Sequence, residues 1–529
     1  MGRSKHSKRN SSIFAATIVL VLASTTAFAQ PKLVVQVVVD QMRAEYLQRY
    51  KEDFTEKGFI LLMDSGHVYT NAHYNYVPTY TGPGHASIST GTTPKHHGVV
   101  ANDWIDARNG YQMYCAEDTT VMPVGTVESA SRRSPANLRA LTFADGIKLH
   151  TVGAGKSFGV SVKDRGAIFP AGHFADGAYW MDSQMNFVTS SYYRDELPDY
   201  VTNFNKKEKA LEALDKGWKL EYRAKRYEES LQDENPYEPK LNDGTSSFPY
   251  DLKAMAEKKG IGVLKNTPVA NEMVTKLAME LIKHEDLGKD EHTDFLGISY
   301  SAPDYAGHTF GVRSREVQDM YLKLDKDLAE LIQYLERKVG HRQYIIYLTA
   351  DHGASENPNH LADGGFKVRN YNNADVVRMA NRAIEEELGL HNAVLKIYNH
   401  HVYLTDNAKA RAGEVALVLE TLDPFLHVYT AGEIRAGNVG GNLGAKLHQG
   451  HQTRFSGDLV FALQPNAIFY GPYGSTHGSS YTYDTHVPFL IMGYGVEHAV
   501  DLDIIFITDL VDRVAEAARL PYAPNSTLQ

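Results

Sequence analysis

The stretch Leu33-Val-Val-Gln-Val-Val-Val39 is the first long apolar run after the N-terminal segment, and it ends at Asp40. Apart from Gln36, every residue in it is apolar, with no alternation of apolar and polar positions. Such a run is typical of a strand that is buried on both faces, as in a parallel sheet covered by helices. The stretch therefore predicts a central parallel sheet, with a carboxylate at the carboxyl end of its first strand.

Further strands and helices follow this first strand along the chain. Four later apolar runs repeat the pattern: Phe158–Val162, Phe295–Tyr300, Tyr344–Thr349 and Pro488–Met492. Between them, residues 317–335 and 273–281 carry apolar side chains at three- and four-residue spacing, which predicts amphipathic helices. Strands that alternate with helices predict an α/β fold in three layers, a largely parallel central sheet with helices on both faces. In that architecture ligands bind beyond the carboxyl ends of the strands.

Two stretches do not follow the strand–helix alternation. Residues from about 172 to 262 are rich in tyrosine and charge, and residues from about 360 to 465 mix helical patterns with Gly-rich turns. Neither is bounded by a flexible linker, and there is no internal repeat. We therefore expect a single domain over residues 30–529, with insertions at about 172–262 and 360–465.

The N-terminus has the pattern of an export signal. A basic start (Arg3, Lys5, Lys8 and Arg9) precedes an apolar centre at residues 13–23, and Ala27-Phe28-Ala29 offers a cleavage site before Gln30. The apolar centre is short for a membrane span, although an uncleaved anchor is the alternative. We expect residues 1–29 to be a signal peptide and the mature protein to be periplasmic or secreted, without stable membrane insertion.

Charge and cysteine content exclude some classes of protein. The formal net charge of −10 over 529 residues argues against a nucleic-acid-binding protein. The single cysteine, Cys115, excludes an internal disulfide and a cysteine-based zinc site. A metal site in this chain would have to use its histidines and carboxylates.

A candidate nucleophile lies in the segment Pro78-Thr-Tyr-Thr-Gly-Pro-Gly-His85. A hydroxyl beside a Gly-Pro-Gly turn is well placed for nucleophilic attack, because the glycines let the backbone approach a ligand closely. Taken alone, such a segment is more often an ordinary turn, and Thr79 and Thr81 are equivalent candidates within it.

Metal-ligand patterns follow the predicted strands. Asp304 and His308 are four residues apart, which lets them meet on one side of a helical turn. Asp351 and His352 come straight after a strand. The remaining candidates are Asp40, at the end of the first strand, and His486, just before the last one. Each pattern alone usually marks a turn or a helix cap, but six donors of this kind at strand ends suit two zinc ions or similar divalent metals.

Seven segments, in this order, carry a family resemblance: Val39-Asp40, Pro78–His85, Asn102-Asp-Trp104, Ser161-Val-Lys-Asp-Arg-Gly166, Asp304–His308, Asp351-His-Gly353 and Tyr483-Asp-Thr-His486. The chain resembles the alkaline phosphatase superfamily, and most closely the PafA-type (phosphate-irrepressible) alkaline phosphatases, which are secreted zinc enzymes. The resemblance runs from about residue 30 to the C-terminus and implies the alkaline-phosphatase-like version of the three-layer fold.

The resemblance also implies a role for each site residue. It makes Thr81 the nucleophile, which would form a phosphothreonine, and leaves Thr79 as scaffold. It implies two zinc sites and a phosphoryl-binding group. One zinc would be bound by Asp304, His308 and His486, the other by Asp40, Asp351, His352 and Thr81, and the phosphoryl oxygens by Asn102, Lys163 and Arg165.

These residues favour a phosphate monoesterase over related activities. A monoester has three non-bridging oxygens and a diester two, so Lys163 and Arg165 favour small-molecule phosphate monoesters. The alternatives are a nucleotide pyrophosphatase/phosphodiesterase of the same superfamily and, in another class, an exported phosphate-binding protein. Sulfatases require a Cys/Ser-x-Pro-x-Arg motif, which Thr81–His85 does not match. We expect the enzyme to be a monomer.

Overall fold

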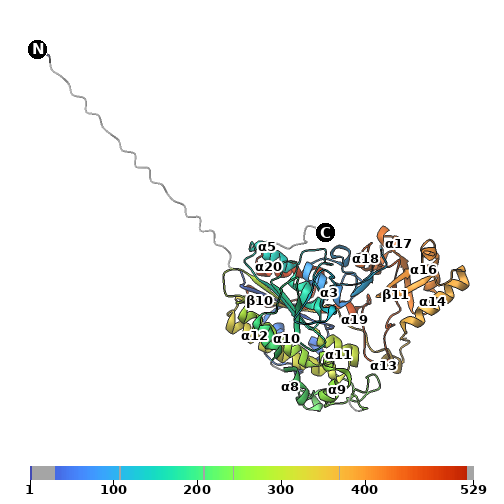
Figure 1. Cartoon of the computed structure of the whole chain (residues 1–529), viewed down its shortest axis with the longest axis horizontal. Helices are drawn as coiled ribbons and strands as arrows, with labels where there is room; N and C mark the ends of the chain where they lie inside the picture. Colours follow the sequence, from blue (N-terminus) through green and yellow to red (C-terminus); the bar gives the residue numbers. More distant parts are fainter. Residues whose placement is uncertain (3–29, 107–108, 207–208, 242–243, 369, 521–529) are drawn as a thin grey trace.

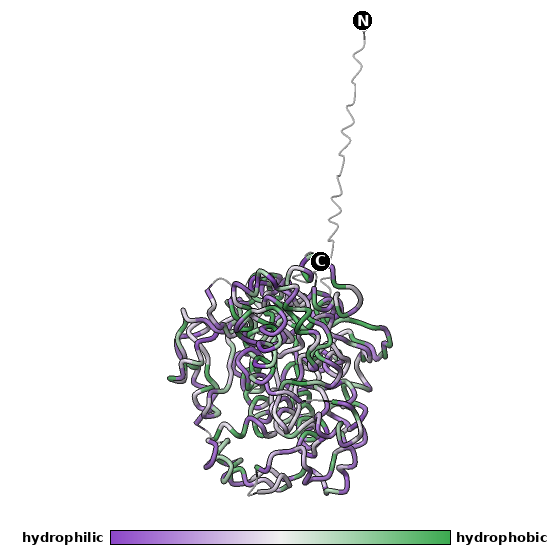
Figure 2. The backbone as a smooth tube through the Cα atoms, turned by 90° about the vertical axis from the view of Figure 1, so that its right-hand side faces the viewer, coloured by the Kyte–Doolittle hydropathy of each residue, from purple (hydrophilic) through white to green (hydrophobic). Residues whose placement is uncertain are grey.

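The structure is a computed structural model that describes residues 1–2, 30–106, 109–206, 209–241, 244–368 and 370–520. The predicted signal peptide therefore lies almost wholly outside the described residues. Within these ranges the chain forms one large mixed sheet, a smaller four-stranded sheet and a short two-stranded ribbon of β3 (Asp103–Ile105) and β4 (Gln112–Tyr114). The hydrophobic stretches gather around the centre of the molecule (Figure 2).

The main sheet has parallel strands at its centre. In spatial order these are β10 (Tyr344–Thr349), β1 (Leu33–Val39), β9 (Asp294–Tyr300), β6 (Ser157–Ser161) and β7 (Gly177–Met181). All seven residues of β1 are buried, and the one polar member, Gln36, accepts a hydrogen bond from the Tyr347 hydroxyl at 2.6 Å. The predicted fold class is confirmed, because strands β1, β6, β9 and β10 form where the apolar runs lie.

Antiparallel pairings occur on both sides of the parallel centre. Next to β10 lies the antiparallel strand β15 (His486–Gly493), which pairs antiparallel with β2 (His67–His73). The short strands β16 (Ala499–Asp501) and β17 (Ile505–Phe506) pair with β2 in parallel. Beyond β7 lie β8 (Phe187–Ser190) and β5 (Pro123–Val124). Residues 177–190, which the sequence analysis assigned to an insertion, thus belong to the main sheet. The described residues that follow them in this predicted insertion, 191–206, 209–241 and 244–262, contribute no strand to the main sheet.

Helices lie on both sides of the main sheet (Figure 1). One side carries α10 (Pro268–His284), α11 (Ala302–Phe310) and α12 (Arg315–Lys338), and the other carries α3 (Thr81–Thr90), α5 (Phe143–His150) and α20 (Leu510–Ala518). α6 (Asp164–Ala171) packs against β6, β7 and β9. The other helices before α10 are α1 (Tyr46–Arg49), α2 (Phe59–Ser65), α4 (Pro94–His97), α7 (Asp199–Lys206), α8 (Lys209–Lys216) and α9 (Leu252–Lys259).

The second predicted insertion contains the four-stranded sheet. Its antiparallel strands are β11 (Val394–Tyr398), β12 (His401–Leu404), β14 (Leu459–Leu463) and β13 (Phe425–Thr430). Its helices are α13 (Pro358–Asp363), α14 (Asn373–Leu388), α15 (Asp406–Lys409), α16 (Ala412–Glu420), α17 (Ala431–Ala436) and α18 (Gly441–Gly450). Val376, Val402 and Phe461 belong to a hydrophobic core of its own, separate from that of the main sheet. Figure 1 shows this region at one side of the molecule.

Candidate functional site

The candidate nucleophile stands at the first position of α3. Tyr80 caps the helix in an extended conformation, and the Thr81 Oγ1 lies 3.3 Å from His352 Nε2 and 3.5 Å from Lys163 Nζ. The hydroxyl of Thr79 instead donates to the Ser479 carbonyl at 3.0 Å. Of the two threonines, only Thr81 presents its hydroxyl to the other site residues.

Glycine is required behind Thr81. A Cβ at Gly84 would lie 2.3 Å from the carbonyl oxygen of Asp351, closer than real contacts allow. The first turn of α3 therefore packs backbone to backbone against the end of β10, and this contact brings Thr81 beside Asp351 and His352.

Asp40 and Asp351 meet at the carboxyl ends of β1 and β10. Both are fully buried, and Asp40 Oδ1 and Asp351 Oδ2 have no hydrogen-bond partner among the described residues. Burial, together with the charges of Asp304 and Asp351, raises the pKa of Asp40 well above its usual range, and burial raises that of Asp351 to about 7. Buried carboxylate oxygens without donors are costly unless a cation or a proton compensates them.

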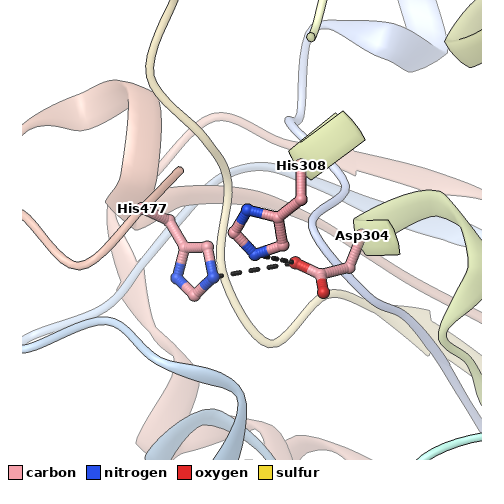
Figure 3. A group of neighbouring side chains, drawn as sticks. All are labelled: Asp304, His308 and His477. Atoms are coloured by element: carbon pink, nitrogen blue, oxygen red, sulfur yellow. Dashed lines mark ion pairs between the residues drawn. The ribbon is translucent and has the colours of Figure 1, made fainter. Parts of the chain in front are cut away.

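A second group forms around Asp304 in α11. Its Oδ1 lies 3.2 Å from His308 Nε2, one helical turn on, and 3.6 Å from His477 Nε2, and Figure 3 shows both rings turned toward this carboxylate. Burial opposes ionisation of Asp304, but His308 and Lys163 outweigh it and hold its pKa well below the usual range. The backbone of Gly474 supports the group, since a Cβ there would lie 1.9 Å from the His308 carbonyl.

His477 occupies the position that the sequence analysis gave to His486. His486 Nε2 donates instead to the Thr70 carbonyl at 2.9 Å, and its ring stacks on that of His73 with centroids 4.6 Å apart. The reason is strand order, because β15 carries His486 beyond its pairing with β10 and next to β2. The assignment of His486 as a metal ligand is thus corrected to His477. The available signal was the His477-Gly478 dipeptide, which parallels His352-Gly353.

Backbone carbonyls orient the three histidines of the site. The Nδ1 of His308 donates to Ser475 O at 2.7 Å, that of His477 to Thr79 O at 2.8 Å and that of His352 to Gly353 O at 2.9 Å. A carbonyl can only accept, so Nδ1 carries a hydrogen in all three rings, and Nε2 is the nitrogen that faces the carboxylate cluster and can bind a metal when the ring is neutral. Burial and the neighbouring His477 lower the pKa of His352 well below its usual range, which keeps it neutral.

These groups fit divalent metal ions. Two sets place their ligand atoms within 4.8 Å of one another, Asp304 with His308 and His477, and Asp40 with Asp304 and His352. Asp351 adds the unpartnered oxygen beside the second set. Carboxylate oxygens and neutral imidazoles without cysteine suit zinc or a similar first-row metal, and the lone pairs are already aimed inward.

Lys163 lies between the two sets. Its Nζ contacts Asp40 Oδ2 at 2.7 Å and Asp304 Oδ2 at 2.5 Å. Burial alone would lower the pKa of this ammonium, but Asp304 and Asp40 outweigh it and raise the pKa. Lys163 therefore stays positively charged next to Thr81.

Arg165 and Asn102 border the same space. Arg165 Nη1 donates to the Tyr114 hydroxyl at 2.8 Å, and this hydroxyl donates in turn to Asp164, so the guanidinium is held in place. The Gly82 N–H donates to Asn102 Oδ1 at 2.7 Å, which turns the Asn102 amide nitrogen, a donor, away from Gly82. A buried hydroxyl, groups that could hold divalent metals and three donors of this kind at one edge of an α/β sheet form the arrangement expected of a hydrolase that acts on phosphate esters.

Comparisons with known proteins agree with this class. Residues 34–487 match the family described as type I phosphodiesterase / nucleotide pyrophosphatase. Alkaline phosphatase PafA from Elizabethkingia meningoseptica is 35% identical over 94% of this chain and 93% of its own. A protein from Myroides odoratus named calcium-transporting ATPase is 34% identical over 97% and 98%. The crystal structure of PafA superposes with a TM-score of 0.88 at 34% identity, covering 93% of this chain and 96% of that one.

The chain belongs to the alkaline phosphatase superfamily, within the type I phosphodiesterase / nucleotide pyrophosphatase family, and it is a PafA-like phosphatase. The resemblance stated from the sequence is thereby confirmed. Among the described residues, no helix combines the length and the apolarity that crossing a membrane requires.

Proposed function

We propose that the protein is an exported, zinc-dependent phosphomonoesterase that works through a phosphothreonine on Thr81. The observation that carries this proposal is a cluster around His352 Nε2, which lies 3.3 Å from the Thr81 hydroxyl and 3.5 Å from both Asp40 Oδ1 and Asp351 Oδ2. Neither of these buried carboxylate oxygens has a hydrogen-bond partner among the described residues, and the Lys163 ammonium lies 3.5 Å from the same hydroxyl. Zinc bound by the two sets of ligands would lower the pKa of a coordinated hydroxyl and stabilise negative charge on the leaving oxygen.

The residues of the chain would divide the remaining work. Thr81 Oγ1 attacks phosphorus, so that an oxygen–phosphorus bond forms as the ester bond to the leaving alcohol breaks. Water then attacks the phosphothreonine, which releases inorganic phosphate and restores the hydroxyl. The Nε2 of His352 lies 3.3 Å from Thr81 Oγ1. Because the pKa of this imidazole is well below its usual range, the ring is neutral and can accept a hydrogen bond from the threonine hydroxyl.

Three donors are available for the non-bridging oxygens. Lys163 supplies a point charge, Arg165 a planar fork and Asn102 an amide N–H. A monoester can use all three, whereas a diester has one non-bridging oxygen fewer. This difference favours small phosphate monoesters as substrates over diesters.

Replacement of Thr81 tests the proposal directly. Thr81→Ala in the zinc-loaded enzyme should lower kcat/KM for a phosphate monoester by several orders of magnitude, because the covalent route is lost. Thr79→Ala is the matched control, since it removes a hydroxyl two residues away that donates to the Ser479 carbonyl. Rapid quenching with labelled substrate should trap phosphate on Thr81. Near-normal turnover by folded, metal-loaded Thr81→Ala would exclude the role.

Export, metal content and assembly belong to the same proposal. Residues 1–29 would be removed as a signal peptide, leaving one catalytic domain that acts as a periplasmic or secreted monomer. Elemental analysis of the purified enzyme should find about two zinc ions per chain. One ion, or a different metal that supports full activity, would contradict the two-zinc site.

A further inference from the structure

A second group of buried carboxylates lies away from the catalytic site, where the loop of residues 231–241 and 244–250 covers the N-terminus of α12. Glu238 belongs to this loop, and Glu316 is the second residue of α12. Their side chains are 3% and 0% exposed, and Glu238 Oε2 and Glu316 Oε2 have no hydrogen-bond partner among the described residues. Both oxygens are shielded from solvent and accept no hydrogen bond from the described residues, and such burial of a carboxylate raises the free energy of the folded state.

The remaining carboxylate oxygens of Glu238 and Glu316 accept hydrogen bonds, but these bonds leave one nearby acceptor without a donor. Glu238 Oε1 accepts from the Asn235 amide at 2.5 Å, and Glu316 Oε1 accepts from the Tyr250 hydroxyl at 2.6 Å. The same hydroxyl contacts the carbonyl oxygen of Ser246. Tyr250 has a single hydrogen to donate, so one of these two acceptors is left without it.

Ser246 provides an independent observation at the same place. Its side chain is 1% exposed, and its Oγ is buried without a partner among the described residues. Its carbonyl oxygen lies within hydrogen-bonding distance of the hydroxyl that also contacts Glu316. A carboxylate oxygen of Glu316 and the carbonyl oxygen of Ser246 thus meet at the Tyr250 hydroxyl, and Ser246 Oγ is a further buried oxygen that accepts from none of the described residues.

Positive charge near the pair is limited. Arg315 Nη1 lies 3.6 Å from Asp233 Oδ2, and the same guanidinium also lowers the pKa of Glu238 and Glu316, so three carboxylates share this one positive charge. Burial, and then the charge of Glu316, raise the pKa of Glu238 to about 10, and burial raises that of Glu316 to about 8. A proton can neutralise part of this negative charge at neutral pH, and at alkaline pH a further cation besides Arg315 would compensate what remains.

We propose that Glu238 and Glu316, together with oxygen atoms of Ser246, bind one Ca²⁺ ion. The donor set consists of oxygen alone, which selects a hard cation rather than zinc, and Ca²⁺ accepts the irregular mixture of carboxylate, carbonyl and hydroxyl ligands that a loop supplies. Mg²⁺ demands a near-ideal octahedron and keeps several waters, which such a buried site does not accommodate.

The position of this calcium site gives it a structural role. The loop residue Leu231 donates from its backbone to Arg313, and Tyr237 accepts at its carbonyl from Gly474 at 3.1 Å. Gly474 precedes Ser475, whose carbonyl orients His308. An ion bound between the loop and α12 would therefore also stabilise the segment of Gly474 and Ser475, which orients His308, without contacting substrate.

Calcium binding is measured on the zinc-loaded mature enzyme, first stripped of calcium on a chelating resin and resupplied with zinc. We expect retention of one Ca²⁺ per chain and a melting temperature at pH 9 that rises by several degrees in about 1 mM Ca²⁺. Tb³⁺ should bind at the same place and luminesce on excitation of the adjacent Tyr250. Equal melting temperatures with and without calcium, and no bound calcium, would overturn the proposal.

Two isosteric variants and one control locate the site. Glu238→Gln and Glu316→Gln should each weaken calcium binding by about tenfold or more, because the affinity of such sites follows the charge of the ligands. Glu234→Gln is the matched control, since this neighbouring loop carboxylate is 55% exposed and pairs with Lys240. Unchanged calcium affinity in both glutamine variants would contradict the assignment. If neither variant folds, competition between Ca²⁺ and Tb³⁺ on the unmodified enzyme decides.

Discussion

The catalytic centre and the Glu238–Glu316 pair both bury several carboxylates, but they are surrounded by different groups. In the catalytic centre, Asp40 and Asp304 face the Lys163 ammonium and three imidazoles whose lone pairs point inward. Around Glu238 and Glu316 the donors and acceptors are a phenol, an amide and oxygen atoms. The comparison teaches that imidazole nitrogens distinguish a site suited to zinc from a site suited to a hard cation, although the buried carboxylates of both look alike in the sequence.

The sharpest test of the catalytic side compares two histidines. His477→Ala should lower monoesterase activity by at least about a hundredfold, because a metal ligand is lost. His486→Ala should leave activity within about twofold, since it removes only a stacking contact with His73 and a bond to the Thr70 carbonyl. Steady-state kinetics and zinc content of both purified variants decide this. The reverse order of effects would restore His486 as the ligand.

Selectivity between esters should depend on two cations of the catalytic side. In the double variant Lys163→Ala/Arg165→Ala, kcat/KM for a monoester should fall by about a hundredfold more than that for a diester, because the diester makes less use of these donors. The diester rate of the same variant serves as its internal control. A uniform loss for both substrates would mean that the two cations support the fold or the metals rather than the third oxygen.

Titration of the Glu238–Glu316 pair should change the free energy of unfolding and leave catalysis largely unchanged. Both carboxyls have a pKa that is higher in the folded than in the unfolded protein, about 10 for Glu238 and about 8 for Glu316, so the folded state binds more protons above pH 5. In calcium-free buffer the free energy of unfolding should therefore fall as pH rises from about 5 to about 10, with a slope on the order of 1 kcal/mol per pH unit.

Urea denaturation at several pH values measures this slope. Glu238→Gln should reduce it, because one titrating group is removed, and added calcium should reduce it in the unmodified protein. Because other buried carboxyls such as Asp351 also have raised pKa values, the comparison with the variant decides, and an equal slope in Glu238→Gln and in the unmodified protein would show that Glu238 is not buried in the way described.

The sequence predicted the central part of the fold and most of the candidate site for one physical reason. Strands buried on both faces, such as β1 and β10, need continuous apolar runs, and in a parallel sheet their carboxyl ends meet at one edge. Asp40 and Asp351 could therefore be placed together before any contact was known. Local spacing likewise predicted the pairing of Asp304 with His308.

Two kinds of feature were not predicted: the order in which strands lie side by side in the sheet, and the positions of residues on long loops. His486 does begin a strand at the correct edge, but nothing local tells that β2 lies beside it and β10 does not. The loop that carries His477 is positioned by distant backbone groups, such as the carbonyl of Thr79. Residues 177–190 lack long apolar runs because they form short strands near the far side of the sheet, and so they resembled an insertion.

The close approach at Gly84 and Gly474 has a consequence for how this enzyme can change. Each glycine presses one catalytic segment against the backbone of another, so neither segment can shift without displacing its neighbour. New substrate preferences are therefore expected to arise from substitutions at outer positions, around Tyr114, which contacts Arg165, and in the four-stranded sheet. The two segments in contact at Gly84 and Gly474 should change little, because they can move only together. Directed evolution of this scaffold should accumulate its productive substitutions in those outer positions.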